Sequence, residues 1–194
     1  MKKISLLILF YTSFINLPAQ HRTDSIHITH YDINLSIIDF SGQTINGYTN
    51  ITATTRLDSI PHISFDLREM QIDSIFVNDS LTNNYIYKND KIEIILPDNK
   101  SGDTINFKIA YNGHPYNEET FGGFYYVGNY AFNLGAGIHT IPHCLGSAWF
   151  PCIDEFTDKS TYTFHIRTPK EKMAVCGGLL IDSLYLSDST RVWT

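Results

Sequence analysis

In the stretch Ile105-Asn106-Phe107-Lys108-Ile109-Ala110-Tyr111, large apolar side chains occupy every second position. Successive side chains of a strand point to opposite faces, so this pattern predicts a half-buried β-strand. The same alternation recurs in residues 31–37 and 163–167, and Gly, Asn, Asp and Ser clusters separate such runs. No segment after residue 20 keeps a 3.6-residue period. The sequence therefore predicts an all-β fold, a multi-stranded antiparallel β-sandwich or saddle.

The first 20 residues are predicted to be a secretory signal peptide. Lys2 and Lys3 precede an apolar run from Ile4 to Leu17, and Pro18-Ala19-Gln20 follows it. The run is shorter and more interrupted than the roughly 20 apolar residues of a transmembrane helix. We therefore expect an exported protein, periplasmic or extracellular, with one domain over residues 21–194 and no membrane association after signal cleavage.

Composition indicates which partners and which disulfide bonds are expected. The chain has 14 Lys and Arg against 20 Asp and Glu, a net charge of −6, and its cations do not cluster. Nucleic-acid binding, which needs clustered cations, is therefore not expected. Three cysteines leave two alternatives open. One pair bridges, with Cys144 and Cys152 the nearest in sequence, or Cys144, Cys152 and Cys176 are all buried as small apolar residues.

No constellation for metal binding or catalysis is visible in the sequence. His139 and His143 are four residues apart, but Pro142 argues against a helix, and on a strand they would be about 13 Å apart. The motifs H-E-x-x-H, Cys-x-x-Cys and G-x-S-x-G are absent. The adjacent pairs Glu118-Glu119 and Asp154-Glu155 are expected to be solvated. We predict no catalytic, metal-ligating or cofactor-binding residue in this chain, which alone is not expected to be an enzyme.

Residues 112–137 differ from the alternating runs because they combine many glycines with Tyr and Phe. Two interpretations remain open. The segment is a structured excursion that binds a ligand, or it is a hairpin whose aromatic side chains cover a sheet edge.

The stretch Trp149-Phe150-Pro151-Cys152-Ile153-Asp154-Glu155-Phe156-Thr157-Asp158-Lys159, here called the signature block, carries a resemblance to a known family. It resembles the W/F-P-C-x-D-E-x-x-x-K signature in the N-terminal domain of aminopeptidase N-type zinc peptidases, the gluzincin aminopeptidases. Three further segments, 31–35 with 45–51, 111–113 and 161–169, are similar to other parts of that domain. The resemblance covers essentially all of the chain after residue 20.

The resemblance implies a non-catalytic β domain that walls one side of a substrate cleft. The zinc and the H-E-x-x-H motif would belong to a separate catalytic metallopeptidase domain, the implied partner, and the G-x-M-E-N motif of that domain is also absent here. A structural role is implied for seven residues: Trp149, Phe150, Pro151, Cys152, Asp154, Glu155 and Lys159. Within them, the aromatic residues are expected in the core and Asp154 is expected to pair with Lys159 at the surface.

One departure from the family pattern concerns the residues that would face substrate. Typical members carry a Q-x-E-like segment and an Arg just before the signature block, whereas residues 140–148 contain neither. Thr140 and His143 are the candidate cleft-facing residues in that stretch. Strict aminopeptidase specificity is therefore not implied, although a peptide remains an expected ligand of the cleft.

The last residues predict an interrupted structural unit. Residues 184–194 have the pattern of strand, turn and strand, and the alternation still runs at Trp193. We expect the domain to be truncated at its C-terminal end, with Trp193 exposed on a partly unpaired strand. The alternative is a stand-alone exported β-sandwich that binds peptide or glycan through residues 112–137.

Overall fold

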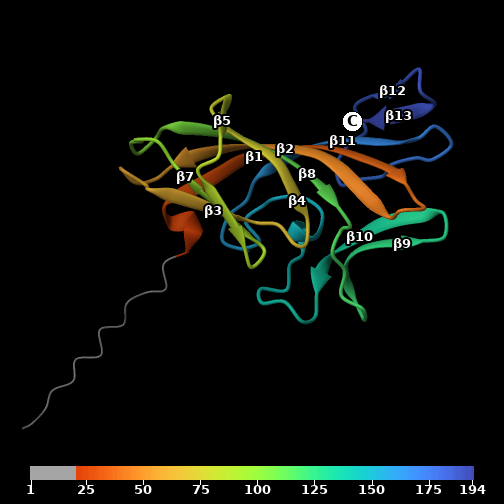
Figure 1. The fold of residues 1–194 in the computed structure, drawn as a ribbon, viewed down its shortest axis with the longest axis horizontal. Coiled ribbons are helices and arrows are strands. Elements are labelled where there is room, and N and C mark those ends of the chain that lie inside the picture. The colour runs from red at the N-terminus through yellow and green to blue at the C-terminus, as the bar shows by residue number, and fades with distance from the viewer. Residues whose placement is uncertain (1–20) are drawn as a thin grey trace, which may run out of the picture.

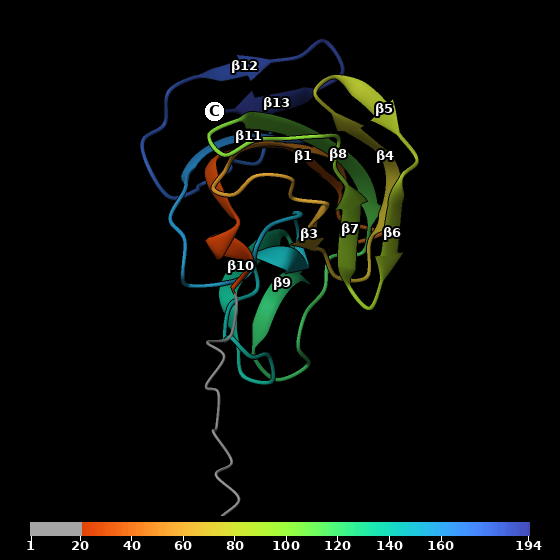
Figure 2. The same cartoon turned by 90° about the vertical axis from the view of Figure 1, so that its left-hand side faces the viewer.

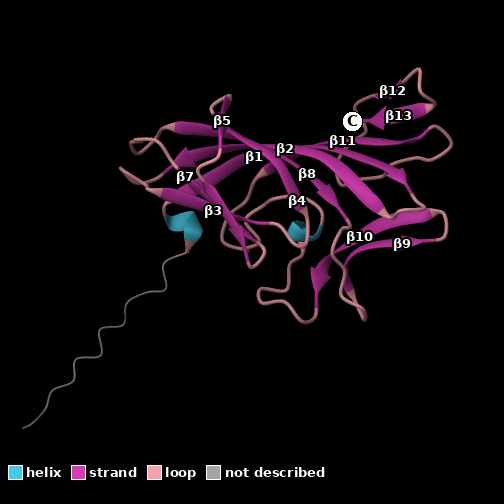
Figure 3. Ribbon diagram, viewed as in Figure 1, coloured by secondary structure: helices cyan, strands magenta, loops and turns pink. Residues whose placement is uncertain are grey.

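The computed structural model describes residues 21–194 and confirms the all-β prediction (Figure 3). The predicted signal peptide, residues 1–20, lies outside the described residues. Two 3-10 helices, η1 (Arg22–Asp24) and η2 (Gly146–Ala148), are the helical elements of the described part of the chain. Within residues 21–194, no helix is long and apolar enough to cross a membrane.

The strands follow one another along the chain, and the longest connections are residues 138–160 and 170–182. The strands are β1 (Ile26–Asp39), β2 (Thr44–Thr55), β3 (His62–Asp66), β4 (Gln71–Val77), β5 (Ser80–Thr82), β6 (Tyr85–Lys88), β7 (Lys91–Ile95), β8 (Thr104–Gly113), β9 (Gly122–Val127), β10 (Tyr130–Gly137), β11 (Thr161–Pro169), β12 (Ser183–Tyr185) and β13 (Thr190–Trp193).

Eight strands form one large sheet in the order β12-β13-β11-β1-β2-β8-β4-β5 (Figure 1). The long central strands β1, β2 and β8 alternate between buried and more accessible residues, with register shifts in the pairing of β1 with β2. Their inward side chains, such as Ile33, Ile51 and Ile109, are fully buried. All pairings in this sheet are antiparallel except that of β1 with β11, where Ile33 lies opposite Phe164. The sheet is therefore mixed, which the sequence pattern did not predict.

Two smaller sheets lie on one side of the large sheet, which curves over them (Figure 2). One has the order β3-β7-β6, and the other is the β9–β10 hairpin. Phe65 on β3 meets Phe107 on β8 edge-on, with ring centroids 5.2 Å apart, and both rings are buried. The core thus fills the space between the large sheet and its two smaller neighbours.

The glycine-rich segment forms the β9–β10 hairpin, as one of its two interpretations predicted. Its inward aromatics do not cover a sheet edge but join the core. Phe124 is buried and packs at 6.1 Å from Trp149, and Tyr126 meets Phe40, in the turn between β1 and β2, edge-on at 5.5 Å. The hairpin is thereby fixed beneath the large sheet.

The expectation that Trp193 is exposed on an unpaired strand is wrong. Strand β13 lies between β11 and β12, paired with both. Trp193 is 7% exposed, and its indole Nε1 donates a hydrogen bond to the Thr168 hydroxyl at 3.0 Å. The alternation at the end of the chain correctly predicted that one face of the last strand is buried. It could not predict which strands lie beside that strand.

Candidate functional site

The signature block crosses beneath the large sheet between η2 and β11. Residue Cys152 pairs with Asp66 at the end of β3 through two backbone hydrogen bonds, of 2.7 and 3.0 Å. Phe150 and Pro151 are buried, and Trp149 stacks on Phe164 at 6.0 Å with nearly parallel rings. The first half of the block is thus built into the core, and its second half is left to make polar contacts.

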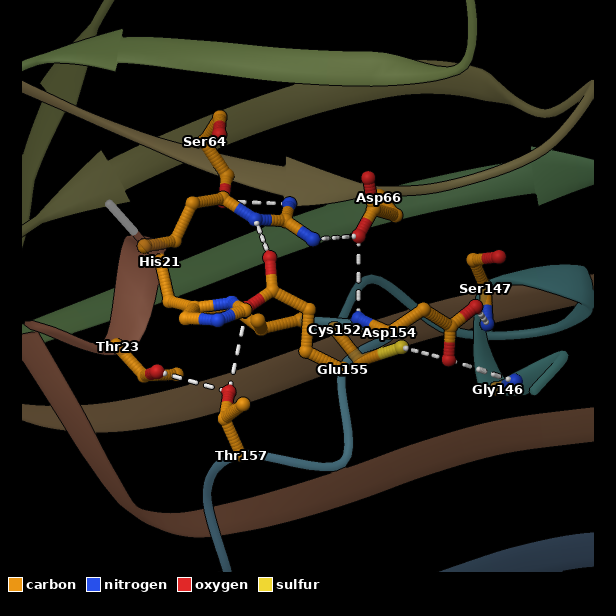
Figure 4. A network of polar contacts seen from close by, with 12 residues as sticks. His21, Thr23, Ser64, Asp66, Gly146, Ser147, Cys152, Asp154, Glu155 and Thr157 are labelled. Atoms are coloured by element: carbon orange, nitrogen blue, oxygen red, sulfur yellow. Dashed lines mark hydrogen bonds and ion pairs between the residues drawn. The ribbon is translucent and has the colours of Figure 1, made fainter. Parts of the chain in front are cut away.

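The carboxylate of Asp154 is the centre of those polar contacts (Figure 4). It accepts hydrogen bonds from the backbone N–H of Gly146 and of Ser147, both at 3.0 Å, and from the Cys152 thiol at 3.4 Å. The predicted ion pair with Lys159 is therefore wrong, because the carboxylate turns inward to the start of η2. Lys159 is exposed. Asp154 fixes the chain that enters the signature block.

A second set of contacts ties the block to the N-terminal end of the described chain. Arg22 contacts Asp66 at 2.6 Å and Glu155 at 2.7 Å, and the backbone N–H of Asp154 donates to the same Asp66 carboxylate at 3.0 Å. Burial opposes the charge of Arg22, but the two carboxylates outweigh it and raise the pKa of the guanidinium. Glu155 is therefore an ion-pair partner, and sequence spacing could not link it to a residue 133 positions away.

The segment before the block, residues 138–145, is held at its other end by Glu118. This carboxylate, 3% exposed, accepts the backbone N–H of Ile138 at 2.7 Å and of His139 at 3.0 Å. A Cβ atom at Gly137 would lie 2.6 Å from both the Glu118 carboxylate and the Thr140 hydroxyl, so only glycine fits there. The expectation that Glu118 is solvated is wrong. No pattern in the sequence indicated this buried carboxylate.

The two candidate cleft-facing residues lie on the 138–145 segment with different exposure. The side chain of His143 is exposed, whereas Thr140 is buried and its hydroxyl has no hydrogen-bond partner within residues 21–194. Ile138 and Ile141 are also exposed, Ile141 at 93%. The accessible surface of the segment therefore consists of two isoleucines and two imidazoles, since His139 is exposed as well.

All three cysteines are free thiols in different surroundings. Cys152 is buried, Cys144 is half-buried and Cys176 is exposed, so the expectation that all three are buried is wrong for Cys176. Burial and the nearby Asp154 carboxylate raise the pKa of Cys144 to about 11, and the same causes raise the pKa of Cys152. Both thiols are therefore protonated at neutral pH.

The histidines, cysteines and carboxylates of the part described by the structure do not assemble a metal centre. Within residues 21–194, no group of three or more His, Cys, Asp or Glu side chains is arranged to hold a metal ion. His139 contacts the Thr120 hydroxyl at 3.4 Å, and His143 lies exposed on the same segment. What the site offers is a segment of fixed backbone rather than a set of reactive groups.

Glu118 makes the segment sensitive to acid. Burial opposes ionisation of this carboxylate, but the N–H groups of Ile138 and His139 outweigh it and lower the pKa of Glu118 below its ordinary value of 4.5. A lowered pKa means that the stabilisation is present above the ordinary value and is lost as pH falls through the folded-state pKa. We expect the stability difference between wild type and Glu118→Gln to be constant near neutral pH and to shrink below about pH 4.5.

Urea unfolding at a series of pH values measures this difference. The neighbouring Glu119 is exposed and supplies a matched control. Glu119→Gln should leave the stability close to that of wild type throughout. If the two variants have the same pH dependence, Glu118 does not hold the segment.

Comparison with protein families finds a match over most of the chain. The family described as "Peptidase M1 N-terminal domain" matches residues 27–194. No curated protein sequence matches the chain.

Solved structures with a similar fold include a zinc metallopeptidase, an aminopeptidase and a hydrolase. The M1 zinc metallopeptidase from Deinococcus radiodurans has a TM-score of 0.76 and 19% identity over 87% of this chain and 38% of its own. Legionella pneumophila aminopeptidase A, in complex with aspartic acid, has a TM-score of 0.70 and 17% identity over 87% of this chain and 19% of its own. Native yeast LTA4 hydrolase has a TM-score of 0.63 and 16% identity over 88% of this chain and 27% of its own.

These likenesses show a shared fold. The chain spans 38% or less of the length of each of the three structures. The matched residues include the signature block and the 138–145 segment, both of which lie within residues 27–194.

Proposed function

The chain belongs to the peptidase M1 N-terminal domain family, and from that premise we propose that it is the non-catalytic scaffold that walls the substrate cleft of an exported metalloaminopeptidase-like protein. The observation that carries this proposal is the double anchoring of the 138–145 segment. Glu118 binds two backbone N–H groups at its start, and Asp154 binds two immediately after its end. The segment is therefore positioned before any substrate arrives.

A fixed segment suits a cleft wall better than a binding site of its own. Four of its backbone N–H groups donate within the described chain: those of Ile138 and His139 to the Glu118 carboxylate, and those of Cys144 and Leu145 to the carbonyls of Pro142 and Gly135. The exposed side chains of the segment are those of Ile138, His139, Ile141 and His143. Such a surface shapes a neighbouring reaction centre and excludes water from it. Positioning residues contribute to catalysis in this way.

The partner we propose is a catalytic metallopeptidase domain that holds the zinc ion. When bound there, zinc would activate a water molecule for attack on a peptide bond. In support, exposed apolar side chains occur on or next to the β9–β10 hairpin and on the 138–145 segment: Phe121, Phe132, Leu134, Ile138 and Ile141. A surface of this kind is typical of one that another protein domain covers.

The alternative of a stand-alone module that binds peptide or glycan through residues 112–137 is not favoured. Some of the aromatic residues that suggested a binding site pack in the core instead, since Phe124 is buried and Tyr126 packs on Phe40. The Tyr126 hydroxyl also donates to the backbone of Thr44 at 2.9 Å. The inward face of the hairpin is thus part of the packed core and is not available to a ligand.

Purified residues 21–194 test the proposal directly. We expect no stoichiometric zinc after dialysis, no hydrolysis of chromogenic amino-acid amides with added zinc, and no tripeptide or oligosaccharide binding tighter than about 1 mM, which corresponds to about 4 kcal/mol. The physical reason is that the cleft wall holds one side of a substrate and none of the reacting groups. Metal analysis, activity assays and calorimetry provide the three readings.

The Deinococcus radiodurans M1 zinc metallopeptidase serves as the positive control in the metal and activity assays. One tightly held zinc per chain, or turnover that follows this chain through purification, would contradict the non-catalytic assignment. Micromolar binding of a peptide or glycan by the chain alone would instead support the stand-alone module.

A further inference from the structure

Two cysteines, Cys144 and Cys152, lie near the point where the 138–145 segment joins the signature block. The Cys152 thiol donates to Asp154 Oδ1 at 3.4 Å. A Cβ atom at Gly146 would lie 3.0 Å from Cys152 Sγ and 3.1 Å from the same Asp154 oxygen, so Cys152 Sγ rests against the backbone of Gly146. Cys144 is two residues before Gly146, which limits the distance between their Cα atoms to about 7 Å.

The Asp154 carboxylate is the shared neighbour of both thiols. It accepts the Cys152 hydrogen bond, and it is also one of the groups that raise the pKa of Cys144. Charge on Cys152 is opposed by the same carboxylate and also by Cys144. The helix η2 lies between the two cysteines in the chain, and both thiols are affected by the same Asp154 carboxylate.

We propose that Cys144 and Cys152 form a reversible disulfide that fastens the 138–145 segment to the signature block. The pair differs in access, since Cys144 is half-buried and Cys152 is buried. The third cysteine, Cys176, is exposed on a segment after β11 and supplies an internal comparison. The disulfide itself uses only residues of this chain, and its effect on a substrate cleft rests on the proposed function.

The reaction is a thiol–disulfide exchange with a small disulfide such as glutathione disulfide as the oxidant. The Cys144 sulfur attacks that disulfide, loses its proton to water, and forms a mixed disulfide while one glutathione leaves as a thiolate. Cys152 Sγ then attacks the Cys144 sulfur and releases the second glutathione, and its proton passes to the Asp154 carboxylate 3.4 Å away. The two cysteines lose two electrons in total, and the glutathione disulfide gains them.

The chemistry of the site sets the speed of this reaction. Because the thiolate is the nucleophile, raised thiol pKa values make the first step slow at neutral pH. The rate should rise about tenfold per pH unit between pH 7 and 9, since the pKa of Cys144 is about 11. Cys176, which is exposed, should react with the same oxidant but stop at the mixed disulfide, because it has no second thiol to resolve it.

The experiment treats folded residues 21–194 with excess glutathione disulfide and follows free thiols by differential alkylation and mass spectrometry. We expect Cys144 and Cys152 to become resistant to alkylation together, with the loss of two hydrogens and no added glutathione, while Cys176 carries one glutathione. The oxidised form should melt at a higher temperature than the reduced form, and a reductant should reverse both changes. Wild type suffices for this measurement, so it does not depend on a variant that folds.

Two variants sharpen the result. Cys176→Ser should leave the Cys144–Cys152 bond unchanged, whereas Cys144→Ser should leave Cys152 as a free thiol and remove the gain in melting temperature. A stable glutathione on Cys144 in the folded Cys176→Ser protein would overturn the proposal, because Cys152 would then be unable to reach it. Continued alkylation of both thiols after prolonged oxidation at pH 9 would overturn it as well.

Discussion

Replacing Asp154 with Ala is expected to lower the free energy of unfolding by about 2–4 kcal/mol. The substitution removes the acceptor for the N–H groups of Gly146 and Ser147 and for the Cys152 thiol. Hydrogen bonds to a charged carboxylate are among the stronger ones in proteins. A buried donor that loses its acceptor also carries the full free-energy cost of having been removed from water. Cys152 and Ser147 are buried, so water cannot fully replace the carboxylate.

Chemical denaturation of the wild type and Asp154→Ala measures this loss. Lys159→Ala is the matched control. The sequence predicted that Lys159 pairs with Asp154, but the Asp154 carboxylate turns inward and Lys159 lies exposed. That variant should stay within about 0.5 kcal/mol of wild type. Equal losses for Asp154→Ala and Lys159→Ala would mean that the carboxylate acts at the surface rather than on η2.

Replacing Phe150 with Ala is expected to cost about 3–5 kcal/mol, the usual range for a buried phenylalanine. Phe150 is 6% exposed and meets Tyr31 edge-on at 5.8 Å and Trp149 edge-on at 5.1 Å. Truncation would leave a cavity between the signature block and β1, and the surrounding sheet can collapse only in part. The aromatic contacts add to the loss of apolar burial.

The signature block supplies its own control for this prediction. Phe156 has the same side chain six residues later but is 73% exposed. Phe156→Ala should change the free energy of unfolding by about 0.5 kcal/mol or less in the same denaturation experiment. Should the two phenylalanine variants unfold at the same denaturant concentration, the block would not be part of the core.

Alternation predicted the strands because burial in a sheet repeats every two residues. Residues 105–111 lie within β8 as expected, and their odd-numbered side chains are buried. The pairing of strands is a different quantity, because it depends on contacts between residues far apart in sequence. The parallel pairing of β1 with β11 therefore had no local signal, and neither did the position of β13 between two neighbours.

The polar contacts of the candidate site were the hardest part to predict. A carboxylate in sequence looks the same whether it meets water or backbone N–H groups, which is why Glu118 and Asp154 were placed at the surface. Arg22 gave no signal at all, since its partners Asp66 and Glu155 are 44 and 133 residues away. The family resemblance identified the signature block, and only the fold showed that Asp154 acts on the segment before it.

The parallel pairing of β1 with β11 also bears on how the chain becomes folded as it is made. His30 contacts Thr161 across this pair, at a separation of 131 residues. At roughly 5–20 residues per second, a ribosome takes on the order of ten seconds to add that length of chain. During this time β1 can pair with β2, but its other edge has no neighbour, and unpaired strand edges associate with other chains. The free edge of β1 is thus open to other chains until β11 has been synthesised.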